Sequence, residues 1–428
     1  MTFHDDLRSA ADWVEDYLAR VPDLPVASRA APGETRARLP GSPPEQGEPF
    51  SALLADLDEV ILPGVTHWNH PRFFAWFANT GSEPGILAEL LIAALNVNAM
   101  TWLSSPAATE LEQTVMDWLA QLLGLPRDWH GHIEDTASTA TVAALAAART
   151  LRPGGVVYAS EQANVAVEKA ARLVGLEFRP VDVDDEFRMR ADFPLDDATA
   201  VVATAGTTAT TSVDPIPELA DRCAAAGVWL HVDAAYAGSA AVCPELRWCL
   251  DGADRADSVS VNPHKWLFTP MDCSALWTRR PEAFHETFSA ARAYLPTTTD
   301  AIDLRDYGPA LGRRFRALKL WAVLRFYGAE GLRSLIREHV RLAQLFAAWV
   351  EEEPGWEVVA AHPFSTVCFR CVDADNVELA ARATATGELF VAATHLRGQD
   401  VIRLAIGNAR TTEEDVRRSW EVLKSCAP

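Results

Sequence analysis

The segment Asn262-Pro263-His264-Lys265-Trp266 follows directly after the strand-like run Ser-Val-Ser-Val at 258–261, and Asp233 follows a mainly apolar run at 228–232. A lysine amine can form an imine with a carbonyl cofactor, and a nearby carboxylate can keep the pyridine nitrogen of that cofactor protonated. A half-buried Asp at a strand end is costly unless it meets a cation or a hydrogen-bond donor, and a cofactor N–H⁺ is such a partner. Together, Lys265 and Asp233 predict an enzyme that uses pyridoxal 5′-phosphate.

Both residues also have ordinary structural explanations. Asp233 could cap a following turn, and a lone lysine at a strand end is usually a solvated surface residue. The apolar residues Trp266, Leu267 and Phe268 after Lys265 favour a desolvated amine instead. Asn262 and His264 flank the lysine with an amide donor and a titratable ring.

Hydroxyl residues follow two other predicted elements. Thr136-Ala137-Ser138 precedes the helical run 139–150, and backbone N–H groups at a helix start form a phosphate cradle. Ser and Thr are also common N-caps, so this signal is weak alone. Gly206-Thr207-Thr208 follows the strand-like run 200–203 and either places a hydroxyl beside the cofactor or forms a simple turn.

Composition excludes several classes of protein. A net charge of −21 and a pI near 4.9 disfavour binding to nucleic acid or to an anionic membrane. The apolar runs are too short to span a bilayer, and seven scattered cysteines do not form a disulfide framework. Cys368 and Cys371 lie three apart in a strand-like run and face opposite ways, which disfavours a metal or redox role. We expect a soluble, cytoplasmic protein without a bound metal.

The order of elements predicts an α/β fold. Short apolar runs at 155–158, 200–203, 228–232, 258–261 and 274–277 alternate with Ala/Leu-rich helical stretches, which indicates crossovers and a mainly parallel sheet. Ligands of such sheets gather where strands end. A helix over 5–20 and an extended arm over 21–47 precede this part. A helical segment over 315–349 leads into a smaller domain, with strands near 366–372, 389–393 and 401–406.

At this point the chain resembles the group II pyridoxal phosphate decarboxylases, closest to the aromatic-L-amino-acid decarboxylases, over 68–420. The matching segments are Ser105-Pro106-Ala107 through Glu112, LHVDAAYAGS (230–239), NPHKW (262–266), DCSA (272–275) and LGRRFR (311–316). The resemblance implies an aspartate aminotransferase-like fold of type I, with a mainly parallel seven-stranded sheet in the large domain and a smaller α+β C-terminal domain. It implies a helical arm over 1–81, the large domain over 82–318 and the small domain over 319–428. It also implies a homodimer whose active sites lie at the interface.

The resemblance assigns roles to individual residues. Lys265 would form the imine, Asp233 would contact the pyridine nitrogen and Ala235 would pack under the ring. The phosphate would be held by Ala137, Ser138 and Asn262, with Thr136 beside them, while His264 would lie beside the lysine and Thr208 near the cofactor. Tyr294, on a loop, would supply the proton that replaces CO2. The segment after it, 296–302, looks shorter than is usual in the family.

One departure from the family matters most. The segment Glu161-Gln162-Ala163-Asn164 has Asn164 where the family has a histidine that stacks on the cofactor ring. Asn cannot stack in this way and has no proton that titrates near neutrality. A group of insect relatives resembles the chain here, with Asn at the same position. These relatives react with O2 and release arylacetaldehydes, ammonia and H2O2. We therefore expect the aldehyde product. The alternative is that Asn164 only forms a hydrogen bond with the cofactor, so that protonation by Tyr294 still gives the amine.

The predicted substrate pocket carries aromatic and polar residues. By resemblance it is lined by Trp68, Trp76, Phe77, Asn79, Asn98, Met100 and Met271. The aromatic residues suit a flat side chain, although core packing explains them as well. Because several positions are smaller or more polar than is usual, a hydroxylated aromatic amino acid is the first choice.

Three hypotheses follow from the sequence. The protein is an aldehyde-forming decarboxylase that uses O2, a simple amine-forming decarboxylase, or a non-catalytic dimer that keeps the cofactor as a structural element. The presence of Lys265, Asp233, His264 and Tyr294 together disfavours the third.

Overall fold

The computed structural model describes residues 2–289 and 301–428. Its internal contacts form two compact units. Unit 1 comprises Met1–Ala78, Phe346–Val359 and Phe369–Pro428, and unit 2 comprises Asn79–Leu345 and Ala360–Cys368. The division into domains at 1–81, 82–318 and 319–428 stays a prediction.

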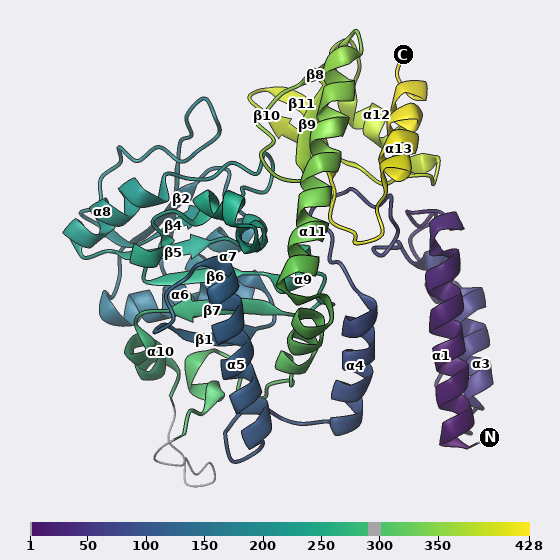
Figure 1. Ribbon diagram of the computed structural model, residues 1–428, viewed down its shortest axis with the longest axis horizontal. Coiled ribbons are helices and arrows are strands. Elements are labelled where there is room, and N and C mark those ends of the chain that lie inside the picture. The colour runs from purple at the N-terminus through teal and green to yellow at the C-terminus, as the bar shows by residue number, and fades with distance from the viewer. Residues whose placement is uncertain (1, 290–300) are drawn as a thin grey trace. The chain divides into compact units, whose positions relative to one another are not determined.

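Unit 2 is built on a seven-stranded sheet with the strand order β1-β7-β6-β5-β4-β2-β3 (Figure 1). Its strands are β1 (His130–Glu134), β2 (Val156–Ser160), β3 (Glu177–Val181), β4 (Ala198–Thr204), β5 (Trp229–Asp233), β6 (Ser258–Val261) and β7 (Ser274–Thr278). β7 is antiparallel to both of its neighbours, and the other pairs are parallel. Six strands therefore run in one direction, which confirms the predicted mainly parallel α/β fold.

Helices connect and cover these strands. The helices of unit 2 are α4 (Glu83–Leu95), α5 (Pro106–Leu123), α6 (Ala137–Leu151), α7 (Val165–Leu173), α8 (Ile216–Ala226), α9 (Pro263–Trp266) and α10 (Pro281–Phe288). The 3-10 segments are η4 (Ala237–Val242), η5 (Pro244–Leu250), η6 (Ala253–Arg255) and η7 (Leu304–Tyr307). Buried alanines of α6 and α7 share one core cluster with Val157 and Val202 of the sheet. Small side chains allow these helices to pack closely on the strands.

Unit 1 contains a four-stranded sheet of order β10-β11-β9-β8. Its strands are β8 (Trp356–Val358), β9 (Thr366–Cys371), β10 (Ala392–Leu396) and β11 (Gln399–Ala405), and the first three residues of β9 belong to unit 2. Its other elements are α1 (Phe3–Arg20), η1 (Val21–Asp23), α2 (Glu34–Arg38), α3 (Phe50–Asp56), η2 (Leu57–Ile61), η3 (Leu62–Gly64), α12 (Asn376–Ala385) and α13 (Glu413–Ser425). The long α11 (Ala317–Glu352), interrupted at Gly328, begins in unit 2 and enters unit 1 at Phe346. In the described ranges, no helix has the length and apolar character that a membrane crossing needs.

The structure confirms the predicted strands and adds three that the sequence did not reveal, β1, β3 and β8. β1 reads His-Gly-His-Ile-Glu, which lacks the alternation of apolar residues typical of a strand. β3 lies at the edge of the sheet and is partly exposed, so its sequence is polar.

A buried ion pair joins α5, β1 and the segment before α11. Arg313 Nη2 donates to Glu112 Oε1 at 2.6 Å and to the Ile133 carbonyl at 2.8 Å, and the Ile133 amide donates to Glu112 Oε1 at 2.8 Å. The side chains of Glu112 and Arg313 are 1% and 2% exposed. Removing one partner would leave a desolvated charge without compensation.

We expect Glu112→Gln to lower the free energy of unfolding by about 3–5 kcal/mol, because Arg313 would remain buried as an unpaired cation. Glu168→Gln, which breaks the exposed pair with Arg172, should cost less than about 1 kcal/mol. Chemical denaturation of both variants measures the difference. Equal losses would show that Arg313 does not depend on the Glu112 charge.

Candidate functional site

Predicted site residues that follow strands of unit 2 lie at one edge of the large sheet. Because β1, β2, β4, β5 and β6 are parallel to one another, their carboxyl ends meet at the same edge. The segments that follow these ends carry Thr136, Asn164, Thr208, Asp233 and Asn262 with Lys265. We call this the carboxyl edge.

Asp233 ends β5 and is 5% exposed. Its Oδ1 accepts a hydrogen bond from the Ala235 amide at 3.0 Å. The other carboxylate oxygen accepts none within the described chain. Since a buried carboxylate is stabilised by a cationic donor, Asp233 fits a protonated ring nitrogen.

The turn that carries Lys265 is fixed by hydrogen bonds to its backbone. The Lys265 amide donates to the Asn262 carbonyl at 2.9 Å, and Thr80 Oγ1 donates to the Lys265 carbonyl at 2.7 Å. The Thr80 amide also donates to the His264 carbonyl at 3.2 Å. Thr80 was not predicted, because no sequence pattern relates it to residues so distant in the chain.

Of the four lysines in the chain, Lys265 has the position that best suits a covalent bond to a ligand at the carboxyl edge. Lys319 is fully buried in ion pairs with Glu89 at 2.5 Å and Asp272 at 3.5 Å. Lys169 is exposed on α7, and Lys424 lies on α13 of unit 1. Only Lys265 follows a parallel strand at the carboxyl edge.

His264 is held as a neutral ring. The Cys273 amide donates to its Nδ1 at 3.0 Å, so the proton of the neutral ring resides on Nε2. Burial lowers the pKa of His264 to about 4, and the positive charge of Lys265 acts in the same direction. Ser274 Oγ donates to Asn262 Oδ1 at 2.7 Å, which fixes the predicted phosphate ligand beside it.

The start of α6 provides backbone donors near the same edge. Thr136 is the N-cap, and its Oγ1 lies 3.1 Å from Thr139 Oγ1 in a capping box. Ala137 and Ser138 are the first two helical residues, whose N–H groups have no partner within a helix. The positive end of the helix dipole suits a phosphate here.

Asn164 and Thr208, which are far apart in the sequence, are in contact. Asn164 is the N-cap of α7, and its Oδ1 accepts a hydrogen bond from the Ala166 amide at 3.0 Å. Its Nδ2 donates to Thr208 Oγ1 at 3.1 Å. Both polar atoms of the amide are therefore engaged, and its plane is fixed.

A compact loop holds Thr208. Gly206 has φ +90°, and a Cβ there would lie 2.7 Å from the Ala237 Cβ, so only glycine fits. At the end of the loop, the Asp214 carboxylate accepts the amides of Thr204 and Met189, each at 2.7 Å. Burial raises the pKa of Asp214 to about 7.

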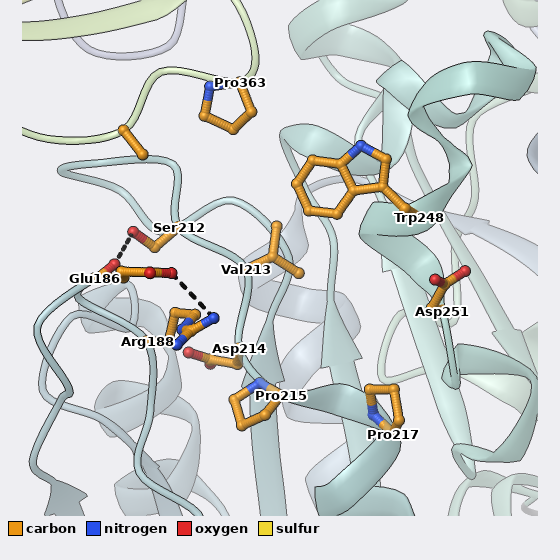
Figure 2. Close-up of a pocket in the computed structure, with 11 residues that line it drawn as sticks. Glu186, Arg188, Ser212, Val213, Asp214, Pro215, Pro217, Trp248, Asp251 and Pro363 are labelled. Atoms are coloured by element: carbon orange, nitrogen blue, oxygen red, sulfur yellow. Dashed lines mark hydrogen bonds and ion pairs between the residues drawn. The ribbon is translucent and has the colours of Figure 1, made fainter.

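Asp214 also lines a cavity of about 320 Å³ with Trp248, Val213 and Arg188 (Figure 2). Arg188 pairs with Asp184 at 2.7 Å and with Glu186 at 3.0 Å. Its positive charge is thus balanced, and the cavity presents no uncompensated cation.

The predicted pocket residues are divided between the two units. In unit 1, Trp68 and Trp76 stack with centroids 5.5 Å apart, and the Arg403 guanidinium lies 4.9 Å from the Phe77 ring. In unit 2, Asn79 Nδ2 lies 3.3 Å from Met271 Sδ, and Asn98 Nδ2 lies 3.6 Å from Met100 Sδ. Tyr294 lies outside the described residues.

His231, a neighbour of Asp233, was not among the predicted site residues. It lies two residues earlier on β5, and this spacing places both side chains on the same face of the strand. His231 Nδ1 lies 2.8 Å from Ser258 Oγ, and Nε2 lies 3.4 Å from Ser260 Oγ. Burial lowers the pKa of His231 to about 4 despite the negative charge of Asp233, so the ring is neutral at pH 7.

Comparison with known proteins identifies close relatives. Residues 32–372 match the family described as "Pyridoxal-dependent decarboxylase conserved domain". Phenylacetaldehyde synthase of Arabidopsis thaliana is 38% identical over 96% of this chain and 93% of its own. Aromatic-L-amino-acid decarboxylase of Sus scrofa is 38% identical over 98% of this chain and 95% of its own. The crystal structure of Oryza sativa TDC with PLP and tryptamine has a TM-score of 0.95 and 36% identity, over 99% of this chain and 97% of that one.

The depressed pKa of His231 predicts a loss of stability in acid. Below pH 6.5 the unfolded chain takes up a proton at this residue, whereas the folded chain does not until about pH 4. Stability therefore falls in this window, by about 1.4 kcal/mol per pH unit. We expect His231→Asn to show a smaller drop in Tm between pH 7 and pH 5 than the unsubstituted protein. The exposed His395→Asn should keep the full drop, and an equal drop in the His231 variant would contradict the assignment.

Proposed function

The chain belongs to the pyridoxal-dependent decarboxylase family, and from this premise we propose that it converts an aromatic L-amino acid to the arylacetaldehyde. The family makes it a carboxy-lyase that depends on pyridoxal phosphate. The family contains both aromatic amino acid decarboxylases and aldehyde synthases. The choice of the aldehyde rests on Asn164.

The residues at the carboxyl edge fit the cofactor. Lys265 would hold it covalently through the ε-amino group, and the available oxygen of Asp233 would keep its ring nitrogen protonated. The N–H groups at the start of α6 and the side chain of Asn262 would bind the phosphate, with Ala235 packed under the ring. When bound, pyridoxal phosphate accepts the electron pair that the substrate carbon retains as CO2 leaves.

Asn164 is the observation that carries the proposal. A histidine at this position would present a flat ring and a proton that titrates near neutrality. Asn164 presents neither, and its amide is held by Thr208 and by the start of α7. The side chain therefore cannot cover a ring face as an aromatic residue does, and it offers no readily transferred proton.

The proposed reaction balances with O2 and water as co-reactants. The amino acid loses CO2, and O2 takes up two electrons and two protons to become H2O2. Water supplies the aldehyde oxygen, and the amino group leaves as ammonia. Dioxygen is thus a co-substrate, and the protein residues position the amino acid and control which reagent reaches the carbon.

The alternative product is the arylalkylamine. It forms if a proton reaches the carbon before O2 does, and the family resemblance implies that Tyr294 donates this proton. A change of about 1.4 kcal/mol in the relative barriers changes the ratio of products tenfold. A single residue beside the cofactor is therefore sufficient to decide the outcome.

We further propose a homodimer in the cytoplasm and a hydroxylated aromatic substrate. The aromatic stack of Trp68 and Trp76 suits a flat side chain. In unit 2, the amides of Asn79 and Asn98 are polar groups able to bind a ring hydroxyl.

Simultaneous measurement of O2 uptake and CO2 release with tyrosine, dopa, phenylalanine and tryptophan tests the proposal. We expect equimolar O2 consumption and CO2 release with at least one of them. CO2 release without O2 uptake would establish the amine-forming reaction instead. Neither signal with any of the four would favour a non-catalytic protein or an unusual substrate.

Replacing Asn164 tests its role in product choice. We expect Asn164→His to shift the products at least about tenfold toward the amine, because a stacked imidazole restricts O2 and can supply a proton. Glu161→His adds the same side chain at an exposed neighbouring position and should leave the ratio unchanged. An unchanged ratio in the Asn164 variant, measured by chromatography of amine and aldehyde, would place the selectivity elsewhere.

Replacing Lys265 tests cofactor attachment. Lys265→Ala should abolish the visible absorbance of the lysine-bound cofactor, because Lys319, the other lysine near His264, is held in buried ion pairs with Glu89 and Asp272. Lys169→Ala, on exposed α7, should retain that band. A band that persists in the Lys265 variant would mean that another lysine carries the cofactor.

A further inference from the structure

Another cavity in unit 2, of about 240 Å³, lies at the amino ends of the parallel strands, opposite to the carboxyl edge. It is lined by the starts of β4 and β5, at Thr199 and Trp229, and by Arg279 just after β7. Since β7 runs opposite to β4 and β5, these ends share one edge. Four steps along β5, at about 3.3 Å each, separate Trp229 in this cavity from Asp233 by roughly 13 Å. This cavity is therefore distinct from the carboxyl edge.

Its lining is strongly basic in an acidic protein. Arg152, Arg279 and Arg280 line the cavity, and Asp257 is the only carboxylate among its lining residues. These four side chains carry a formal charge of +2, whereas the whole chain carries −21. The charge is thus concentrated locally and would attract an anion.

Asp257 cannot neutralise the two arginines that it contacts. Its Oδ1 accepts from Arg279 Nη2 at 2.9 Å and from Arg280 Nε at 3.3 Å, and its Oδ2 accepts from the Leu230 amide at 2.9 Å. Both oxygens of this buried carboxylate are engaged. Within the described chain, Arg279 Nη1 and both Nη atoms of Arg280 donate no hydrogen bond, so these donors are available to a ligand.

The third arginine is held by neutral groups. Arg152 Nη1 donates to the Ala226 carbonyl at 3.3 Å, and Nη2 donates to the Asp196 carbonyl at 3.0 Å. These bonds orient the guanidinium without supplying a full negative charge. The C-terminal ends of α6 and α8 both line the cavity, and each contributes a partial negative charge of about one half, which leaves the cavity positive by about one charge.

We propose that this cavity is a binding site for a phosphate monoester. A phosphate monoester carries about two negative charges at pH 7, so a lining that stays positive attracts it more strongly than it attracts a singly charged anion. Its three terminal oxygens can each accept from a guanidinium fork. Leu151 and Trp229, which also line the cavity, provide apolar surface for a small organic group on the ester oxygen.

Titration calorimetry of the holoenzyme with phenyl phosphate tests the site, because bound cofactor already fills the phosphate cradle at the carboxyl edge. We expect saturable binding of one molecule per chain and at least about tenfold weaker binding of benzoate, which has one charge and two oxygens. Arg280→Gln and Arg152→Gln should each weaken phenyl phosphate binding about tenfold, and Arg280→Lys should recover part of the loss.

Arg190→Gln is the matched control, since it removes one positive charge from unit 2 at an exposed pair with Asp192 outside the cavity. It should leave the affinity unchanged. The proposal is overturned if no saturable binding occurs, if benzoate binds as tightly, or if the Arg190 variant weakens binding as much as the two cavity variants. Cofactor absorbance measured in the same samples separates this result from any loss of pyridoxal phosphate.

Discussion

The common direction of six strands is the constraint on which the site depends. Parallel strands present their carboxyl ends at one edge, so the residues that follow β1, β2, β4, β5 and β6 meet although they are distant in the sequence. Asp233, Lys265, Thr208 and the start of α6 reach the same edge for this reason. The antiparallel β7 begins at Ser274, which fixes Asn262, and the amide of Cys273 just before it fixes His264.

The arrangement also explains how a small change could alter the chemistry. Asn164 is fixed by the start of α7 and by Thr208, which in turn lies on a loop closed by Gly206 and Asp214. A side chain held in this way keeps one position. Because it is an amide, it also has no proton that titrates near neutrality. Relatives in this family include both a phenylacetaldehyde synthase and an aromatic-L-amino-acid decarboxylase, which is consistent with local control of the product.

Much of the large sheet and the positions of Lys265 and Asp233 could be predicted, because buried parallel strands are continuous apolar runs and a polar residue at their end is conspicuous. β1 was missed because His132 and Glu134 are polar yet buried, 3.3 Å apart, in the core of unit 2. The contact of Asn164 with Thr208 could not be predicted, since hydrogen bonds between loops leave no periodic signal. The support of Lys265 by Thr80 was missed for the same reason.

The covalent attachment of the cofactor at residue 265 is tested most directly by borohydride reduction of the holoenzyme, followed by proteolysis and mass mapping of the peptides. We expect a pyridoxyl adduct on the peptide that contains Lys265. An adduct on Lys169, Lys319 or Lys424, or no adduct at all, would contradict it.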